Sequence, residues 1–293
     1  MADKKTSFYD SLFGLEEVTV ENARKKGIPL QDISPDELHE FEGHPFKVIR
    51  NEDFESLMES IRKFGMLEPV VARKKGKGYE IISGHRRTTA ARELGMKTVP
   101  VLVLDLDDDL ARIMVVDANR YRKKFYPSEL AFAFKMRYEA EKHRGKKDGS
   151  GEETADHIGK DYGYSQRNVY NYMKLTQLMP ELLRYVDEKK LVCSAALELT
   201  DLSTDMQRLL VSEYEEDGLF PNLLQAKRIK AKGTFDSTWL REVLLEQEKP
   251  QKKNFSLADL ARFFPENYSD EEKIETIEEL LEQWSREREQ RAL

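Results

Sequence analysis

Apolar and polar positions alternate along residues 33–116 in a way that predicts strands interleaved with helices. A helical stripe over residues 53–64 carries four apolar side chains on one face and ends at a glycine: Phe54, Leu57, Met58, Ile61 and Gly65. Strand patterns follow at residues 68–73, 79–82 and 99–104, and a helix is predicted over residues 88–94. We therefore expect a small α+β domain here.

Helical patterns dominate the rest of the chain. Pro127 begins a helix with Leu130, Phe134 and Tyr138 on one face, and the segment HRGKKDGSGEE that follows it has the composition of a linker. Near the C-terminus, Ser269 caps a helix whose apolar stripe lasts two heptads at most, which is too short to predict a coiled coil.

These patterns divide the chain into five parts. We expect an N-terminal tail, an α+β domain, a basic connecting helix with its linker, an all-α domain, and a helical C-terminal region that could dimerise. Their predicted bounds are 1–32, 33–116, 117–152, 153–231 and 232–293.

Composition narrows the class of protein. Charged residues make up 35% of the chain, no apolar run has the length of a membrane span, and the N-terminus has no signal-peptide core. The single cysteine, Cys193, excludes an internal disulfide, and the five histidines lack the spacing of metal ligands. We expect a cytoplasmic protein with no membrane partner and no zinc.

The net charge of -7 hides an uneven distribution. Residues 118–150 hold ten Lys or Arg against four Asp or Glu, whereas residues 234–293 hold nine against fifteen. DNA binding responds to a local basic face rather than to the average charge. The basic segment is therefore a candidate for DNA contact, although a solvated helix with scattered lysines has the same composition.

The turn between the strand at 79–82 and the following helix has the chemistry of a phosphate site. Gly84 allows a close approach of the backbone, and a helix N-terminus points unpaired N–H groups outward. Arg86 and Arg87 add planar, charged forks that suit phosphate. An ordinary strand–helix turn with solvated arginines is the alternative.

Residues 155–174 have the pattern of a helix-turn-helix. Gly159 is small where two helices touch, Gly163 sits at the turn, and Val169 takes the buried position of the second helix. We expect that helix to bind DNA through side chains that reach base edges or phosphates: Ser165, Gln166, Arg167, Asn168, Asn171 and Lys174. A helical hairpin with a glycine turn and no DNA contact is the alternative.

The segment SGHRRTTAARELGMKTVPVLV resembles the box that marks the ParB family of partition proteins. The resemblance covers roughly residues 33–229, and a weaker likeness to ParB proteins of plasmids and mobile elements extends to the C-terminus. It implies a ParB/sulfiredoxin-like α+β domain followed by the helix-turn-helix domain. It also implies a site-specific, dimeric partner of double-stranded DNA whose tail contacts a ParA-type ATPase.

ParB-family domains bind CTP with magnesium and switch to a state that clamps DNA. By this resemblance, the nucleotide ligands are two groups of residues: Gly84, His85, Arg86 and Arg87 in the box, and Asn119 and Arg122 after the α+β domain. Asn119 would also contact Mg²⁺. Ala118 stands where the family has a glutamate, Tyr126 where it has an asparagine, and Phe46 where it has an arginine. We therefore expect at most a weak CTPase.

Two other functions keep the same fold. One is a DNA-binding regulator of a mobile element that has lost nucleotide switching, which the alanine at position 118 favours. The other is an enzyme: sulfiredoxins share the domain but place a cysteine beside the glycine turn, whereas Cys193 is remote in this sequence. A nuclease would use clustered carboxylates, but the acidic run at residues 105–109 is placed to cap a helix at Leu110.

Overall fold

The computed structural model describes residues 19–145 except 121 and 123, residues 153–246, and residues 260, 263–265 and 267–291 near the C-terminus. The chain divides into two compact units, Met1–Leu245 and Glu246–Leu293. No helix of the described residues is long and apolar enough to cross a membrane.

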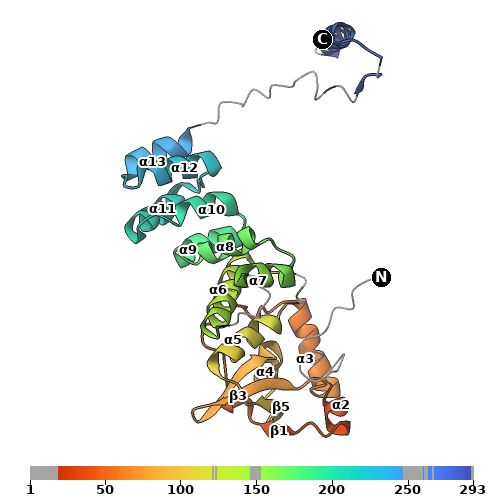
Figure 1. Ribbon diagram of the computed structural model, residues 1–293, viewed down its shortest axis with the longest axis vertical. Coiled ribbons are helices and arrows are strands. Elements are labelled where there is room, and N and C mark those ends of the chain that lie inside the picture. The colour runs from red at the N-terminus through yellow and green to blue at the C-terminus, as the bar shows by residue number, and fades with distance from the viewer. Residues whose placement is uncertain are drawn as a thin grey trace. The chain divides into compact units, whose positions relative to one another are not determined.

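A mixed five-stranded sheet forms the centre of the N-terminal half (Figure 1). Its strands run in the order β1 (Leu30–Ile33), β5 (Val99–Leu104), β3 (Val70–Lys75), β4 (Gly78–Ser83) and β2 (Leu38–His39). The pairs β1–β5 and β3–β4 are antiparallel, while β3–β5 and β2–β4 are parallel. The central strands are buried on both sides, which explains why they read as short continuous apolar runs.

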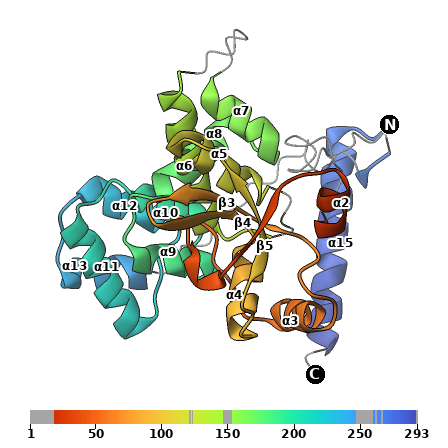
Figure 2. The same cartoon turned by 90° about the horizontal axis from the view of Figure 1, so that it is seen from below.

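Helices cover both faces of this sheet, as Figure 2 shows. On one face, α3 (Glu52–Phe64) and α4 (His85–Glu93) contribute Phe54, Ile61 and Ala90 to a core shared with Val70 and Val101. On the other face, α5 (Asp108–Asp117) packs on the sheet and forms a second core. The helix contributes Ala111, Met114 and Val115, and the sheet contributes Val71, Ile82 and Leu102. A short helix, α2 (Val20–Lys25), precedes β1.

A run of helices follows the sheet. The helix α6 (Pro127–His143) carries Leu130 and Phe134 into a core shared with α7 (Thr154–Tyr162) and α8 (Gln166–Leu175). A larger core joins the next five helices: α9 (Pro180–Asp187), α10 (Cys193–Leu199), α11 (Thr204–Asp217), α12 (Leu223–Lys232) and α13 (Ser237–Leu245). The second unit contains α15 (Asp270–Arg291), which Ser269 caps by accepting from the N–H of Glu272 at 3.2 Å.

The predicted fold class, an α+β domain followed by helical regions, is confirmed. Element positions agree closely: β5 spans the predicted residues 99–104, and α3 ends at Phe64 before Gly65 with φ 72°. The helix predicted over residues 88–94 begins three residues earlier, at His85, and β3 starts two residues later than expected. Asp107 accepts from the N–H of Leu110 at 2.7 Å, so the acidic run does cap α5.

Candidate functional site

The turn before α4 places a helix N-terminus at the sheet edge. Gly84 is the N-cap residue with φ 101°, in the left-handed region that glycine tolerates. A Cβ at this position would lie 3.3 Å from the backbone of Val70 in β3, so a side chain here would crowd the neighbouring strand. The first N–H groups of α4 lack intrahelical acceptors and carry the positive end of the helix dipole.

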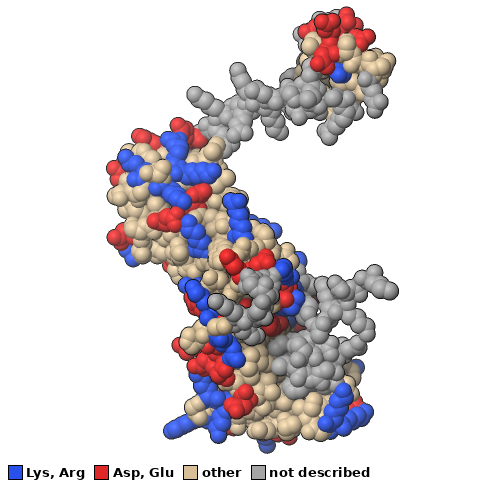
Figure 3. All heavy atoms as spheres, viewed as in Figure 1, with Lys and Arg blue, Asp and Glu red and all other residues tan. Residues whose placement is uncertain are grey.

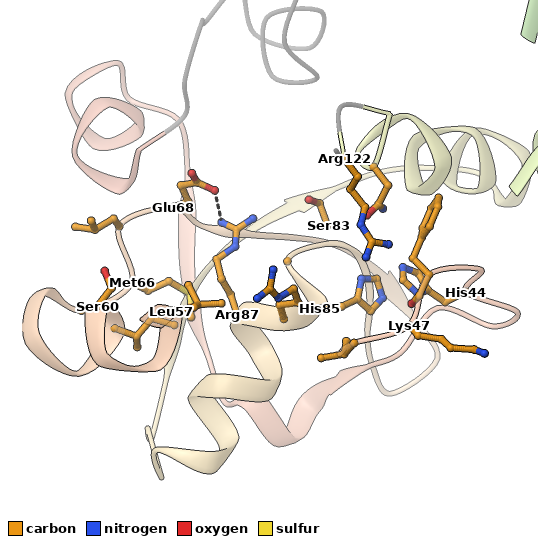
Figure 4. Close-up of a pocket in the computed structure, with 18 residues that line it drawn as sticks. His44, Lys47, Leu57, Ser60, Met66, Glu68, Ser83, His85, Arg87 and Arg122 are labelled. Carbon is orange, nitrogen blue, oxygen red and sulfur yellow. Dashed lines mark hydrogen bonds and ion pairs between the residues drawn. The ribbon is translucent and has the colours of Figure 1, made fainter. Parts of the chain in front are cut away.

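A cavity of about 430 Å³ opens at this helix start. Every residue predicted to bind nucleotide lines it: Gly84, His85, Arg86, Arg87, Asn119 and Arg122. Figure 4 shows two differing sides, with His44, Lys47 and Arg122 on one and Leu57, Met66 and Arg87 on the other. The cavity therefore combines cations with an apolar wall, as a charged ligand with a flat ring requires.

The three arginines of the cavity are held differently. Arg87 donates to the carbonyl oxygen of Pro69 at 2.9 Å and pairs with Glu68 at 3.1 Å (Figure 4). Arg86 is exposed, and within the described part of the chain it makes no ion pair; its guanidinium lies 6.0 Å from the ring centroid of Phe54. The turn therefore holds one arginine that Glu68 orients and one that is open to a ligand.

Arg122 approaches the cavity from the segment after α5. Its guanidinium lies 3.2 Å from the buried carboxylate of Glu129 and 5.5 Å from the ring centroid of Phe46. Glu129 also accepts from the N–H groups of Lys47 and Tyr126, at 3.1 and 3.0 Å. This carboxylate therefore joins the segments of Lys47 and Arg122, which border the same side of the cavity.

The same segment is poor in metal ligands. Asn119 donates from Nδ2 to the carbonyl oxygen of Val115 at 3.0 Å, which leaves Oδ1 for a ligand. Glu68 is the carboxylate among the cavity's described lining residues, and Arg87 already binds it. Among the described residues, no three His, Cys, Asp or Glu side chains gather as a metal site. The side chains present do not by themselves form a magnesium site.

Asp117 does not replace the carboxylate that Ala118 lacks. Its Oδ1 lies 2.8 Å from the guanidinium of Arg137, whose side chain is buried, and Asp117 is not among the cavity's lining residues. Burial raises the pKa of Asp117, partly offset by the charge of Arg137. A helical side chain one position earlier points about 100° away, and here it points into the α5–α6 contact.

The helix-turn-helix has the geometry that its sequence predicts. A Cβ on Gly159 would lie 2.4 Å from the carbonyl oxygen of Tyr164, so α7 and the turn touch directly. Gly163 ends α7 with φ 75°, Val169 is fully buried, and Ser165 caps α8 by accepting from the N–H of Asn168 at 3.3 Å. The two helices pack on α6 through Leu130 and Phe134.

The side chains predicted to contact DNA differ in their exposure and in the partners that they bind. Arg167 and Asn168 are exposed near the start of α8. Gln166 donates to Glu153, and Lys174 lies 2.9 Å from Asp201, which also pairs with Lys230 at 2.7 Å. Asn171 is half-buried beside Cys193 in a small hollow between α8 and α10.

Several residues of these surfaces were not predicted from sequence. Tyr170 is 41% exposed on α8, where its spacing of three from Arg167 puts both on one side of the helix. His44 and Lys47 line the cavity, although the segment at residues 44–46 was interpreted only as a departure from the family pattern. Cys193 begins α10 away from the cavity, and burial raises the pKa of its thiol.

The basic segment at residues 118–150 is less basic at its surface than its composition indicates. Arg120 lies 3.0 Å from Asp161, Arg144 lies 2.6 Å from Asp107, and Arg137 is buried among carboxylates. On the face shown in Figure 3, Lys and Arg side chains are interspersed with Asp and Glu. Residues 121, 123 and 146–152, which include Lys123 and most of the predicted linker, lie outside the described residues.

Comparison with known proteins gives consistent matches. Residues 18–120 match the model of the ParB N-terminal domain. The chain is 31% identical over 201 residues to chromosome-partitioning protein Spo0J of Thermus thermophilus, covering 69% of each chain. It is 30% identical to chromosome-partitioning protein ParB of Caulobacter vibrioides, covering 59% of this chain and 53% of that one.

Solved structures with similar folds include two of C-terminally truncated ParB from Caulobacter crescentus. One is complexed to the centromeric parS site, with 24% identity, a TM-score of 0.36 and coverage of 69% of this chain and 99% of that one. The other is complexed with CTP-gamma-S, with 25% identity, a TM-score of 0.30 and coverage of 69% and 98%.

Proposed function

Since this chain belongs to the ParB family of partition proteins, we propose that it binds a specific double-stranded DNA site through α8 and responds to CTP held in the cavity at α4. One observation supports the proposal of nucleotide binding: residues 84–87, Asn119 and Arg122 all line one cavity. They come from two segments that are more than thirty residues apart in sequence.

The cavity supports a polyphosphate ligand in particular. Gly84 permits close approach to the N–H groups of α4, Arg86 offers an open fork, and Arg122 approaches from the opposite side. The apolar side, with Leu57 and Met66, suits a base and sugar. Preference for CTP over other nucleotides rests on family membership. Magnesium would arrive with the phosphates, with Asn119 Oδ1 as the proposed protein ligand among the described lining residues.

DNA reading is proposed for the exposed side of α8. Arg167 and Asn168 stand at its start, where a recognition helix meets base edges, and Tyr170 extends the same surface. Lys174 would first have to leave Asp201 to reach a phosphate. The test is selection of bound sequences from a random duplex library with the full chain: recovery of one shared motif supports the proposal, and recovery of unrelated sequences contradicts it.

A second candidate function has one observation in its favour. Ala118 offers no carboxylate and Asp117 is committed to Arg137, so the one carboxylate among the described lining residues is Glu68, which is paired with Arg87. A DNA-binding regulator without nucleotide switching would have this composition. Binding of labelled CTP to the full chain distinguishes the two, because the regulator would bind DNA and no nucleotide.

Dimerisation and a ParA-type ATPase remain proposals. In the second unit, α15 exposes Ile274, Leu281 and Trp284 by 45, 59 and 57%, a stripe that a second copy would cover. Sedimentation of the full chain and of Leu281→Glu tests it: we expect a dimer that the substitution dissociates, and a monomeric wild type would contradict it. The N-terminal tail at residues 1–32 is proposed to meet the ATPase, and its residues 1–18 lie outside the described residues.

A further inference from the structure

Two histidines from different segments lie against each other at the cavity wall. The ring centroids of His44, in the loop before α3, and His85, the first residue of α4, are 3.7 Å apart, and the rings are tilted by 35° (Figure 4). The Nε2 atoms of both are buried and have no hydrogen-bond partner among the described residues. His85 is only 8% exposed. Buried polar atoms normally have a hydrogen-bond partner, so an unpaired one at the wall of a cavity indicates that a ligand atom binds to it.

The hydrogen-bond geometry fixes the tautomer of His44. Its Nδ1 lies 2.7 Å from the carbonyl oxygen of Phe46, which can only accept, so Nδ1 carries the hydrogen. In the neutral ring Nε2 is then a bare acceptor. A phosphate oxygen is also an acceptor, so it cannot bond to this bare nitrogen. A bound polyphosphate needs the protonated ring, whose Nε2–H can donate.

Burial, more than the surrounding charges, favours the neutral form of both rings in the absence of ligand. Burial lowers the pKa of His44, an effect that Arg122 adds to and that the Phe46 carbonyl and Glu40 oppose. Burial, followed by the charges of His44 and Arg92, lowers the pKa of His85 to about 3. Four other charged residues line the cavity: Lys47, Glu68, Arg86 and Arg87.

We propose that His44 is a proton-gated phosphate ligand: when a polyphosphate enters the cavity, His44 takes one proton from solvent and donates from Nε2–H to a phosphate oxygen. The proposal rests on the proposed nucleotide function. A multiply charged anion beside the ring favours the imidazolium, and the existing bond to Phe46 stabilises it further. His85 stays neutral, because two like charges in rings this close are unfavourable, so uptake is one proton per site.

Proton uptake is measured directly by calorimetry. CTP is titrated into the full chain at one pH in two phosphate-free buffers of different ionisation enthalpy, and the dependence of the heat on the buffer gives the protons taken up. We expect wild type to take up close to one proton more than His44→Asn, whose amide can still donate to Phe46. Protons that the phosphates of CTP take up or release on binding contribute equally to both titrations, so they cancel in the difference between wild type and variant. The control is His143→Gln, a histidine whose side chain is 81% exposed and does not line the cavity.

The pH dependence of affinity gives a second readout. Because the bound state holds the extra proton, CTP affinity should weaken by up to about tenfold per pH unit between the pKa of His44 in the free protein and its higher pKa in the complex. If His44→Asn does not fold, His44→Gln replaces it. The pH dependence of CTP affinity in the wild type tests the proposal without any variant. Equal proton counts in wild type and variant, or wild-type affinity that is flat or rises with pH, overturn the inference while CTP binding stands. Absence of CTP binding at every pH removes the proposed nucleotide function as well.

Discussion

Arg120 donates from Nε to the main-chain carbonyl oxygen of Asp161, 2.7 Å away, and so ties the segment beside Asn119 to the last turn of α7. The side chain of Asp161 also lies 2.5 Å from Arg137, which binds Asp117 at the end of α5. The residue that follows the cavity's Asn119 is therefore in direct contact with α7, the first helix of the helix-turn-helix. A ligand that moves the segment around Arg120 would therefore act directly on α7 of the helix-turn-helix.

Arg137→Met should destabilise this junction strongly. The guanidinium is 3% exposed and binds Asp117, Glu141 and Asp161, so its removal takes a buried cation from all three carboxylates, of which Asp161 keeps its pair with Arg120. Breaking a buried ion pair in this way costs about 3–5 kcal/mol. Urea unfolding of both proteins measures the difference. Arg208→Met, which removes an exposed pair with Asp205, is the control and should change stability by less than about 0.5 kcal/mol.

Glu68→Gln should strengthen nucleotide binding. The carboxylate of Glu68 lies 3.1 Å from Arg87 and competes with a phosphate for the same guanidinium. The neutral amide keeps the shape and removes the competing charge, so we expect the Kd for CTP to fall by about threefold to tenfold, the size of one charge-assisted contact. Titration with labelled CTP measures it. Glu59→Gln, an exposed position of α3 outside the cavity, should leave the Kd unchanged; weaker binding in Glu68→Gln would mean that Glu68 orients Arg87 productively.

Arg167→Ala should abolish sequence preference while the fold remains. Arg167 is exposed at the start of α8, where a fork can pair with guanine at about 1–3 kcal/mol of discrimination. Affinity for a selected site and for scrambled DNA is compared in both proteins. Arg184→Ala, on α9, provides the matched loss of one exposed arginine. An unchanged preference in the Arg167 variant would show that another surface reads DNA.

Acid should destabilise the ligand-free protein through His85. Its pKa is about 3 in the folded state against 6.5 ordinarily, so below about pH 6.5 the unfolded chain binds a proton that the folded chain does not. This histidine should lower stability by up to ~1.4 kcal/mol for each pH unit between the two values. Urea unfolding at pH 7 and pH 5.5 should therefore show a smaller loss in His85→Gln than in wild type. An equal loss in both would mean that His85 is not buried as a neutral ring.

Patterning and turn chemistry predicted most elements of this fold. Apolar spacing located α3 and β5, and Gly159, Gly163 and Ser165 located the helix-turn-helix, because each signal is local. The start of α4 was missed by three residues, since its first turn is polar and faces the cavity. Arginine is a good helix former, but this turn has no apolar stripe from which its periodicity could be recognised.

Contacts distant in sequence could not be predicted. The stacking of His44 on His85, the pairing of Arg87 with Glu68 and the commitment of Lys174 to Asp201 all depend on how elements pack. The same holds for Arg137, whose helical position reads as a solvated cation but which is buried among carboxylates. Charge counts along the sequence therefore overestimate the basic surface near α6.

Equilibrium titration of the full chain with labelled CTP, ATP, GTP and UTP, with and without a selected DNA site, tests the central claim most directly. The account predicts that CTP binds in preference to the others and that Arg86→Ala and Arg87→Ala each remove this binding, because both guanidinium groups line the cavity at the N-terminus of α4. Failure of the wild-type chain to bind any of the four nucleotides, even with its DNA site present, would contradict it.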